Sequence, residues 1–335
     1  MYIQKNKCRK KVHMMDNKDT AKKMWAVLLH LGSNMWGKQG ECHHYVQEQS
    51  IIYHDKMFCD MDIWHKVTEF LPQCGINTVL IDVGEAVRLD SRPEIAAEGS
   101  LSKTEMKKEL DRLRKLGLTP LPKLNFSTTH NGWLGKYNLM IGTKEYQEAC
   151  TDIVEEIIDI FDKPEFFHLG FEEENVEYQK YYPVKIERSW RKKTDDALAV
   201  FEVCRRKGVR PWIWIDPRTM QGFGGVERFR ENVSKDVLLS NWWYEDVYYA
   251  GESENAYTKL YRELDEWGYE QVPTCSTWTC FHNPRQTVKY CEKYLNKELV
   301  KGYMTAPWLT TRPEYYNGLL ADVHMFGQAK KQNNL

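Results

Sequence analysis

The sequence predicts a single-domain (β/α)₈ barrel, also called a TIM barrel, and two observations lead to this fold class. The 335 residues contain eight short apolar runs, which alternate with amphipathic stretches of helical periodicity. Four of these stretches end at a glycine that directly precedes the next apolar run: Gly75, Gly117, Gly208 and Gly268. Glycine just past a helix adopts the left-handed conformation without strain, so the chain can turn into a strand. Strands that alternate with helices pair in parallel, and eight such units close most economically into a barrel.

The apolar runs give the expected strands, which are 25–31, 76–83, 118–126, 165–171, 209–215, 236–243, 270–278 and 301–308. The clearest helices are expected at 62–71, 104–116, 145–161, 189–207, 257–267 and 286–297. In the second of them Met106, Leu110 and Leu113 share one face, which we expect to pack against the sheet. An open doubly wound sheet is the alternative, although no Gly-x-Gly-x-x-Gly follows the first strand to favour it.

We expect residues 24–330 to form the barrel and residues 1–23, which are polar and basic, to form a flexible lead-in. The irregular stretch 32–61 predicts a long loop after the first strand, over the barrel mouth. No linker rich in Pro, Gly or Ser divides the chain. The barrel is therefore expected to be a single domain.

Composition and charge exclude several classes of partner. Lys plus Arg number 47 and Asp plus Glu number 48, and no basic stripe stands out, so nucleic acid is not expected. The sequence contains no run of about 18 apolar residues, so no membrane span is predicted. The N-terminus lacks the apolar stretch of a secretory signal, and the nine scattered cysteines suit reduced thiols. We therefore expect a cytoplasmic protein.

Chemistry in this fold lies at the C-terminal ends of the strands. The polar residues expected there are Asp82 after the second strand, Asn125 and His130 after the third, His168 and the acidic run 172–174 at the fourth, and Asp216 after the fifth. Aromatic residues mark the later strand ends, and they are Trp242, Trp243, Tyr244, Trp278 and Trp308. Because aromatic faces stack on the apolar faces of sugar rings, this rim indicates a carbohydrate pocket.

The acidic run after the fourth strand is the sharpest signal in the sequence. His168, Gly170 and Glu172 alternate onto one side of the strand, while Glu173 lies where the strand becomes a loop and its direction is free. Like charges that lie close together raise the pKa of one carboxyl group, which then stays protonated near neutral pH. Such a group can protonate a glycosidic oxygen.

The segment Phe167-His168-Leu169-Gly170-Phe171-Glu172-Glu173 resembles the strand-four signature His-x-Gly-Gly-Asp-Glu of glycoside hydrolase family 20, the β-N-acetylhexosaminidases. The resemblance implies a (β/α)₈ catalytic barrel with Glu173 as general acid/base. It implies that Glu172 orients the 2-acetamido group of the substrate, whose carbonyl oxygen is the nucleophile, and that His168 supports the motif. The chain departs from the signature at Glu172, where the family has Asp, and at Phe171, where it has Gly. At the last strand, Trp308-Leu309-Thr310 lacks the acid of the usual Trp-x-Glu.

The sequence thus predicts a glycoside hydrolase that removes a terminal sugar, an N-acetylhexosamine or a related hexose. The predicted catalytic residues are Glu173 and Glu172, and the predicted sugar-binding residues are His168, Asp82, Asn125, His130, Asp216, Trp242, Trp243, Tyr244, Trp278 and Trp308. Asp216 or Asp246 is the alternative base for an inverting reaction. A barrel that binds carbohydrate without catalysis is the alternative function.

No metal or organic cofactor is expected, since proton transfer and charge stabilisation suffice to cleave an acetal. Cys42-His43-His44, together with His54, superficially resembles a metal cluster. Adjacent residues diverge in direction, however, and the segment has the composition of a loop, so we do not expect it to bind metal. His30 stands alone in the first strand, without the second histidine of a His-x-His metal motif, and is expected to be a hydrogen-bonded barrel residue.

Overall fold

The computed structural model describes residues 23–36, 53–176, 179, 184–246, 254–333 and 335. Eight parallel strands form its sheet in the order β6-β5-β4-β3-β2-β1-β8-β7. The strands are β1 (Met24–His30), β2 (Thr78–Asp82), β3 (Thr119–Lys123), β4 (Phe166–His168), β5 (Arg210–Ile215), β6 (Leu238–Asn241), β7 (Thr274–Cys275) and β8 (Gly302–Thr305). The two outer strands meet through parallel bridges from Leu239 to Gln271 and from Trp242 to Thr274, which close the sheet into a barrel.

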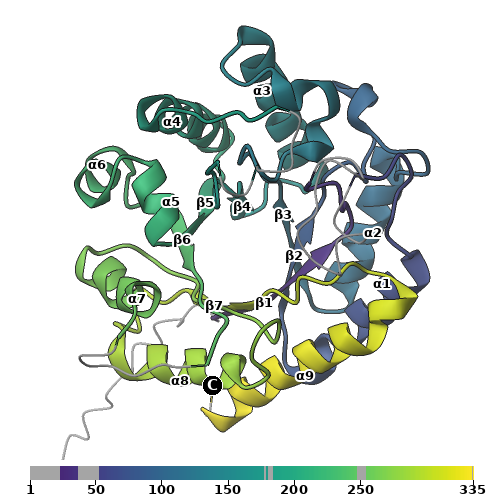
Figure 1. Cartoon of the computed structure of the whole chain (residues 1–335). Helices are drawn as coiled ribbons and strands as arrows, with labels where there is room; N and C mark the ends of the chain where they lie inside the picture. The colour runs from purple at the N-terminus through teal and green to yellow at the C-terminus, as the bar shows by residue number, and fades with distance from the viewer. Residues whose placement is uncertain (1–22, 37–52, 177–178, 180–183, 247–253, 334) are drawn as a thin grey trace, which may run out of the picture.

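Helices surround this barrel on its outside (Figure 1). They are α1 (Met61–Phe70), α2 (Lys103–Lys115), α3 (Lys144–Ile160), α4 (Trp190–Arg206), α5 (Pro217–Gly222), α6 (Val226–Asn232), α7 (Ala256–Glu266), α8 (Asn283–Tyr294) and α9 (Tyr316–Gln332). Short 3₁₀ turns are η2 (Pro72–Cys74), η3 (Pro93–Ile95), η4 (Gly132–Leu139) and η5 (Pro313–Tyr315). The predicted (β/α)₈ barrel is therefore confirmed.

The helix-ending glycines act as the sequence predicted. Gly75, Gly117, Gly208 and Gly268 all have φ between 75° and 80°, which is the left-handed region. The eight strands and six helices expected from the sequence are all present, although several strands are shorter than the apolar runs that contain them. Backbone pairing ends before an apolar run does, because the chain bends away at the barrel mouth.

Three helices were not among those predicted. Helices α5 and α6 are only 6 and 7 residues long, too short for a clear period. Helix α9 has 17 residues, but Gly318 and Gly327 interrupt its pattern. Gly327 is needed for packing, because a Cβ there would lie 2.6 Å from the backbone oxygen of Cys74. The helix therefore follows from close tertiary contact rather than from local propensity.

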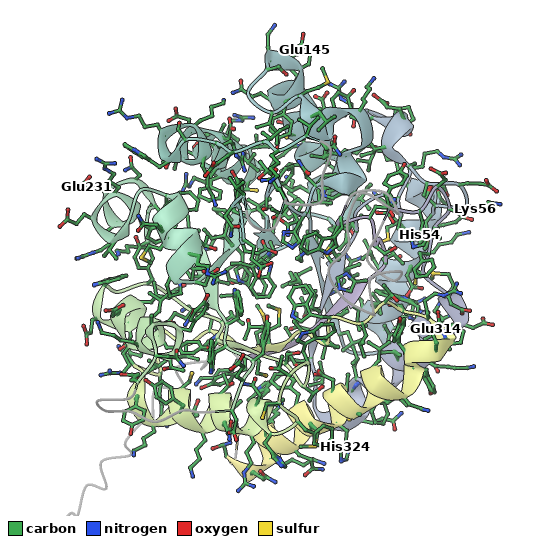
Figure 2. All side chains as sticks on the ribbon, in the orientation of Figure 1. His54, Lys56, Glu145, Glu231, Glu314 and His324 are labelled. Carbon is green, nitrogen blue, oxygen red and sulfur yellow. The ribbon has the colours of Figure 1, made fainter. Side chains whose placement is uncertain are left out.

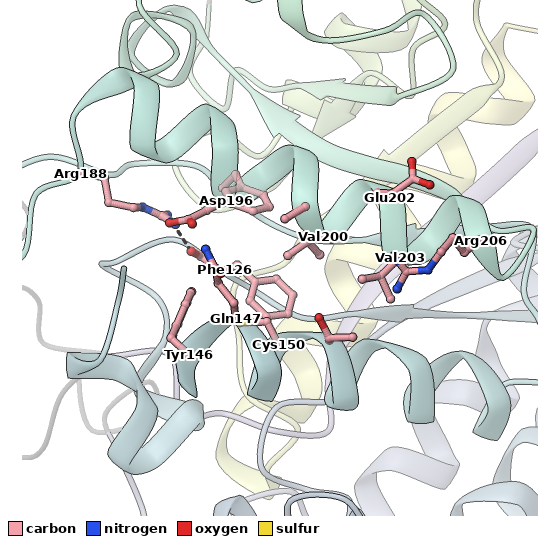
Figure 3. A pocket seen from close by; sticks show the side chains of 13 residues that line it. Phe126, Tyr146, Gln147, Cys150, Arg188, Asp196, Val200, Glu202, Val203 and Arg206 are labelled. Carbon is pink, nitrogen blue, oxygen red and sulfur yellow. Dashed lines mark hydrogen bonds and ion pairs between the residues drawn. The ribbon is translucent and has the colours of Figure 1, made fainter. Parts of the chain in front are cut away.

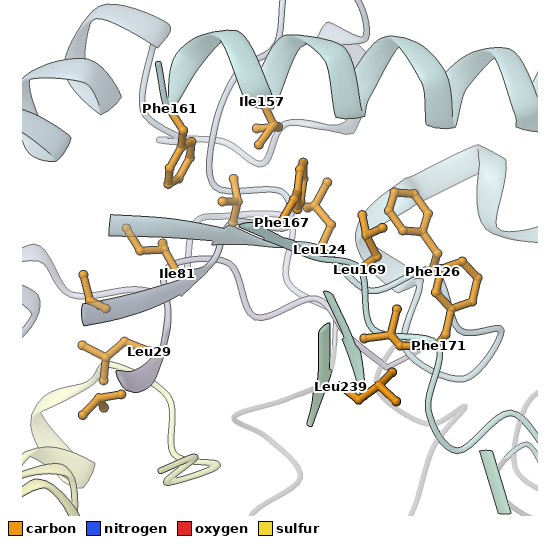
Figure 4. Close-up of a cluster of buried hydrophobic side chains, with 14 of the residues drawn as sticks. Leu29, Ile81, Leu124, Phe126, Ile157, Phe161, Phe167, Leu169, Phe171 and Leu239 are labelled. Atoms are coloured by element: carbon orange, nitrogen blue, oxygen red, sulfur yellow. The ribbon is translucent and has the colours of Figure 1, made fainter. Parts of the chain in front are cut away.

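Two apolar layers hold the barrel together. One fills the space between strands and helices, where Ile81, Leu124 and Phe167 face Ile157 and Phe161 of α3 and its C-terminus (Figure 4). The other fills the barrel interior and consists of Ala26, Leu28, Leu80, Leu121, Phe166, Trp212, Trp214, Leu238, Val272, Met304 and Ala306. The alternation of strand side chains divides the residues between these two layers. Each fully buried large side chain contributes about 1.5–3 kcal/mol to stability.

Charged side chains of both signs extend outward around the barrel, as Lys56, Glu145, Glu231 and Glu314 do in Figure 2. Within the described ranges, no helix is both long and apolar enough to traverse a bilayer.

Strand β1 begins at Met24, so the lead-in predicted for residues 1–23 lies almost entirely outside the described residues. The same holds for residues 37–52 of the predicted loop after the first strand.

Candidate active site

A layer of buried polar residues crosses one end of the barrel. His30, Asp82, Lys123 and His168 are the last residues of β1 to β4 and are register partners of one another in turn. Lys123 Nζ lies 2.6 Å from Asp82 Oδ2, and His30 Nδ1 lies 3.4 Å from the same oxygen. Burial acts to raise the pKa of Asp82, but Lys123 and His30 outweigh burial and hold that pKa at about 2. Asp82 is therefore a carboxylate at neutral pH, held between Lys123 and His30.

His168 lies at the end of this layer nearest the acidic run. Its Nδ1 accepts a hydrogen bond from the Gly170 amide at 3.2 Å, and its ring contacts Trp214 with centroids 4.6 Å apart. Burial and the Lys123 charge lower the pKa of His168 well below its usual value, so the ring is neutral. His168 thus holds the chain at the start of the acidic run, as a residue that supports the motif would.

The chain leaves β4 through a sharply bent segment. Gly170, Phe171 and Glu173 all have positive φ, at 75°, 74° and 53°. Only glycine fits at position 170, since a Cβ there would lie 2.1 Å from Asn125 Oδ1. Phe171 and Glu173 adopt the left-handed region at a cost of about 1–2 kcal/mol per residue. Such strain concentrates at functional sites.

Glu172 is the more deeply buried carboxyl of the acid pair. Its residue is 5% exposed, and Asn125 Nδ2 donates to its Oε1 at 2.7 Å. Its other oxygen, Oε2, is buried and has no hydrogen-bond partner among the described residues. Burial raises the pKa of Glu172 to about 7, despite the opposing charge of Lys123. This carboxyl group is therefore close to half ionised at neutral pH.

Glu173 faces the barrel mouth from the other side of the bend. Its side chain is 22% exposed, and its Oε2 lies 3.4 Å from Nε2 of His130. Burial, with the Lys123 charge, lowers the pKa of His130 to about 3, so the imidazole is neutral and this contact is not an ion pair. Thr129 Oγ1 lies 2.8 Å from His130 Nδ1. When the ring proton is on Nε2, His130 can donate to Glu173 while Nδ1 accepts from the Thr129 hydroxyl.

Three of the predicted aromatic residues gather at the same mouth. Trp242 stacks on Tyr244 with ring centroids 5.0 Å apart, and Tyr244 contacts Trp308 at 6.4 Å. Trp308 in turn contacts Trp214 at 5.8 Å and has a φ of 54°, another left-handed position. Burial raises the pKa of Tyr244, and the charges of Glu173 and Glu172 act in the same direction. Trp214 contacts both Trp308 and His168, so the aromatic group and the start of the acidic run lie at the same end of the barrel.

Two other predicted aromatic residues lie at the edge of this group. Trp243 packs on Tyr257 with centroids 5.0 Å apart. Trp278 is 38% exposed on the loop after β7. That loop touches the aromatic group, because Thr279 Oγ1 donates to the backbone oxygen of Tyr244 at 2.6 Å. Trp278 is therefore available to a larger ligand at the rim.

Three predicted sugar-binding residues already make contacts within the protein. Asp216 caps α5, where its carboxylate accepts from the amides of Arg218 and Thr219 and from the Thr219 hydroxyl. Asp82 binds Lys123, and Asn125 holds Glu172. Their direct contact with a sugar stays a prediction.

Sequence reasoning missed Lys123 and Trp214. Lys123 had a detectable signal, because it is a lone charged residue in an apolar strand and is fully buried. Trp214 lies one residue from the end of β5 and reads as ordinary core in the sequence. Only its contacts with His168 and Trp308 place it in the site.

A cavity of about 250 Å³ lies outside the barrel between α3 and α4 (Figure 3). Tyr146 and Cys150 line it from α3, and Asp196 and Val203 line it from α4. Arg188 lies at one end and pairs with Asp196 at 3.2 Å. Its position on the outer layer separates it from the acid pair at the mouth.

No group of three or more His, Cys, Asp or Glu side chains in the described part of the chain is arranged to hold a metal ion. Cys42, His43 and His44 lie outside the described residues.

Solved structures with a similar fold include β-N-acetylhexosaminidases and related exo-β-N-acetylglucosaminidases. The β-N-acetylhexosaminidase of Bacteroides fragilis aligns with a TM-score of 0.56 and 11% identity, over 90% of this chain and 65% of that chain. The family 20 exo-β-N-acetylglucosaminidase of Vibrio harveyi, solved with N-acetylglucosamine, gives 0.55 and 11%, over 90% and 54%. The Streptomyces plicatus β-hexosaminidase, solved with its N-acetylglucosamine product, gives 0.59 and 11%, over 90% and 63%.

These alignments confirm the resemblance to the family 20 catalytic barrel at the level of the fold. The chain spans about two thirds or less of each of these three proteins. No protein-family model and no curated protein matches the sequence.

Proposed function

We propose that this protein is an exo-acting glycoside hydrolase that removes a terminal N-acetylhexosamine or a related hexose, with Glu173 as general acid/base. The observation that carries the proposal is the position of Glu173. Its carboxyl group lies 3.4 Å from a neutral histidine, at the mouth that buried Glu172 and the aromatic group also line. Structures of similar fold were solved with N-acetylglucosamine, which supports this sugar class.

In the proposed reaction Glu173 donates its proton to the glycosidic oxygen as the bond to the anomeric carbon breaks. The carbonyl oxygen of the substrate's own 2-acetamido group bonds to that carbon and forms a cyclic oxazolinium ion. Water then attacks the anomeric carbon, gives its proton to Glu173 and reopens the ring. The acid is thereby regenerated and the sugar is released.

Glu172 supports this route by its charge and position. Its Oε1 is fixed by Asn125, and its Oε2 is left to accept from the acetamido N–H or to face the developing positive charge. Both roles require the ionised form. Lys123 favours that form, since its charge lowers the pKa that burial raises. The longer side chain of Glu, where the family signature has Asp, places this carboxyl one methylene further from the backbone.

The test compares wild type with Glu173→Gln on aryl glycosides of N-acetylglucosamine, N-acetylgalactosamine, glucose and galactose. We expect the two N-acetyl substrates to be cleaved fastest, and the variant to lose a factor of about 10²–10⁴ in kcat/KM. Leaving groups of different basicity separate acid catalysis from misfolding. The loss should be large for methylumbelliferyl substrates and small for dinitrophenyl ones, whose oxygen needs no proton.

Glu187→Gln is the matched control, because this carboxyl lies on the same loop and is exposed. It should retain wild-type rates on every substrate. A wild-type protein that binds these sugars but cleaves none of them would contradict the proposal and would establish the alternative, a carbohydrate-binding barrel. Equal losses on both leaving groups would remove Glu173 from the acid role.

A further inference from the structure

A cavity of about 360 Å³ lies between the chain that leaves β4, the N-terminus of α4 and the end of α5. Its lining residues come from three segments, the β4 exit, the N-terminus of α4 and the end of α5: Glu174, Glu187, Arg188, Ser189, Trp190, Lys193, Gln221 and Gly222. Glu174 directly follows the proposed acid Glu173, so the cavity is one residue away from the reaction site along the chain. The proposed reaction does not use this cavity.

Lys193 is the unusual member of the lining. It lies in the first turn of α4, is 2% exposed, and its ammonium group has no hydrogen-bond partner in the described ranges. The group lies beside Gly222, since a Cβ built on that glycine would be 3.0 Å from Lys193 Nζ. The ring of Phe223 lies beneath it, with its centroid 5.1 Å from Nζ. One face of the ammonium therefore has a weak aromatic contact, and its N–H donors lack an acceptor.

The buried carboxylates near Lys193 are already committed to other partners, and Glu187, an exposed residue of the lining, makes no hydrogen bond to the ammonium group. Glu174 accepts from Arg188 and from the Thr128 amide. Asp196 pairs with Arg188 and, at 2.6 Å, with Lys192. Asp216 caps α5. Burial lowers the pKa of Lys193, against the attraction of Glu174. A buried cation without a partner is costly, and proteins normally pair such a group.

The N-terminus of α4 adds to the positive character of the cavity. This helix is 17 residues long, and Ser189 and Trp190 at its start line the cavity together with Lys193. The positive end of a helix dipole favours anions. Gly222 has no side chain, so the approach to the ammonium from α5 stays open.

We propose that this cavity binds a small oxyanion, a carboxylate, sulfate or phosphate group, through the ammonium of Lys193. The anion is either free in solution or is a substituent of the bound glycan. The site depends on Lys193 and the cavity and not on glycosidase activity, so binding of a free anion can be measured even if no glycoside is cleaved.

The first test measures binding of inorganic phosphate by calorimetry and by thermal unfolding, against chloride at equal ionic strength. Wild type should bind phosphate and unfold at a higher temperature in it. Lys193→Met should weaken the affinity by about tenfold or more, because it removes a charged hydrogen-bond donor. In chloride alone the same variant should unfold at a higher temperature than wild type, since it no longer buries an unpaired charge.

Two further variants keep the test decisive. Gly222→Ala retains the charge but places a methyl group 3.0 Å from Nζ, and it should also weaken phosphate binding. Lys192→Met is the matched control, because Lys192 is the adjacent lysine and pairs with Asp196 outside the cavity lining, and it should bind phosphate as wild type does. Wild type without a phosphate effect, or phosphate affinity unchanged in both Lys193→Met and Gly222→Ala, would overturn the proposal. A lower unfolding temperature of Lys193→Met in chloride would instead assign the lysine a structural role.

The second arm identifies the source of the anion. Pairs of aryl N-acetylhexosaminides that differ only by a carboxylate or sulfate on the aglycone are compared in wild type and Lys193→Met. A preference of about tenfold for the anionic substrate that disappears in the variant indicates a glycan substituent. Equal rates on both substrates, with phosphate binding intact, indicate a free anion.

Discussion

Glu172 and Glu174 are two residues apart, and both carboxyl groups are buried, yet their surroundings are opposite. Glu174 faces outward to Arg188, which binds both of its oxygens, and the Arg188 charge outweighs burial and lowers the pKa of Glu174. Glu172 faces the barrel mouth, where one oxygen has a donor in Asn125 and burial raises the pKa to about 7. Glu173, between them, reaches His130.

The difference between Glu174 and Glu172 shows that neighbouring carboxyl groups of one acidic run can have a structural or a ligand-facing environment. A carboxylate with its full set of donors fixes the loop, since Arg188 also bonds the backbone oxygen of Phe126 and ties the β3 and β4 exits to α4. A buried carboxyl group with an unused oxygen is less stabilised than one with all its donors, and that oxygen can still accept a hydrogen bond from a ligand. Glu174 therefore fixes the loop that carries the proposed catalytic residues Glu172 and Glu173.

Removing the cation of the fixed region should have the largest effect on stability. Arg188→Met leaves Glu174 and Asp196 buried without their shared partner, which costs about 3–5 kcal/mol. Urea unfolding at pH 7 measures the loss of unfolding free energy. Arg191→Met, which alters an exposed arginine three residues further on, in the first turn of α4, should change it little. If Arg188→Met loses no more unfolding free energy than the control does, the network is not structural.

Neutralising Glu172 should have the opposite effect and raise the free energy of unfolding. Folding raises the pKa of Glu172 from 4.5 to about 7, so its contribution to stability is complete below 4.5 and is lost as pH rises through 7. Glu172→Gln avoids the buried carboxylate and should gain on the order of 2–3 kcal/mol at pH 8 and nothing near pH 4.5. Unfolding at the two pH values measures this.

Glu173→Gln, with a side chain that is 22% exposed, is the comparison for that experiment and should show little gain. Destabilisation of Glu172→Gln at pH 8 would mean that the carboxylate has partners of its own, as Glu174 does.

Asp216 is a buried carboxylate with its hydrogen bonds satisfied, so it should behave like Glu174 on a smaller scale. Asp216→Ala removes the cap of α5 and should cost about 1–2 kcal/mol, while Asp216→Asn should keep most of the cap. With a glycoside substrate, KM should stay within about twofold of wild type in the Asn variant. A tenfold rise in KM would instead make Asp216 a sugar-binding residue.

The smallest expected effect is that of removing Asn125, which donates a hydrogen bond to Glu172. Asn125→Ala removes a contact that lowers the pKa of Glu172, so the acidic limb in the pH profile of kcat/KM should move up by about half a pH unit. Asn131→Ala, on the same loop but bonded to Asn138, is the control. A limb that does not move would assign the acidic pKa to another group.

Local patterns sufficed for much of this molecule. The alternation of apolar runs and amphipathic stretches predicted the barrel, because side-chain periodicity decides which face of each element is buried. The four glycines predicted the helix ends, because only glycine adopts a positive φ at little cost in free energy. Glu172, Glu173 and the aromatic residues after β6 and β8 were identified from their place at strand ends.

Other features depended on distances between segments far apart in the chain. His130 was predicted to bind sugar, but its contact with Glu173 joins two loops 43 positions apart, and the neutrality of its ring depends on burial and on the charge of Lys123. The three acidic residues at 172–174 are identical in sequence. Their different partners arise from the bend at Phe171 and Glu173, which turns neighbouring carboxyl groups toward Asn125, His130 or Arg188. The sequence determined which residues stand at the barrel mouth, and the tertiary structure decided which are paired, because pairing and desolvation depend on side chains brought together from several strands.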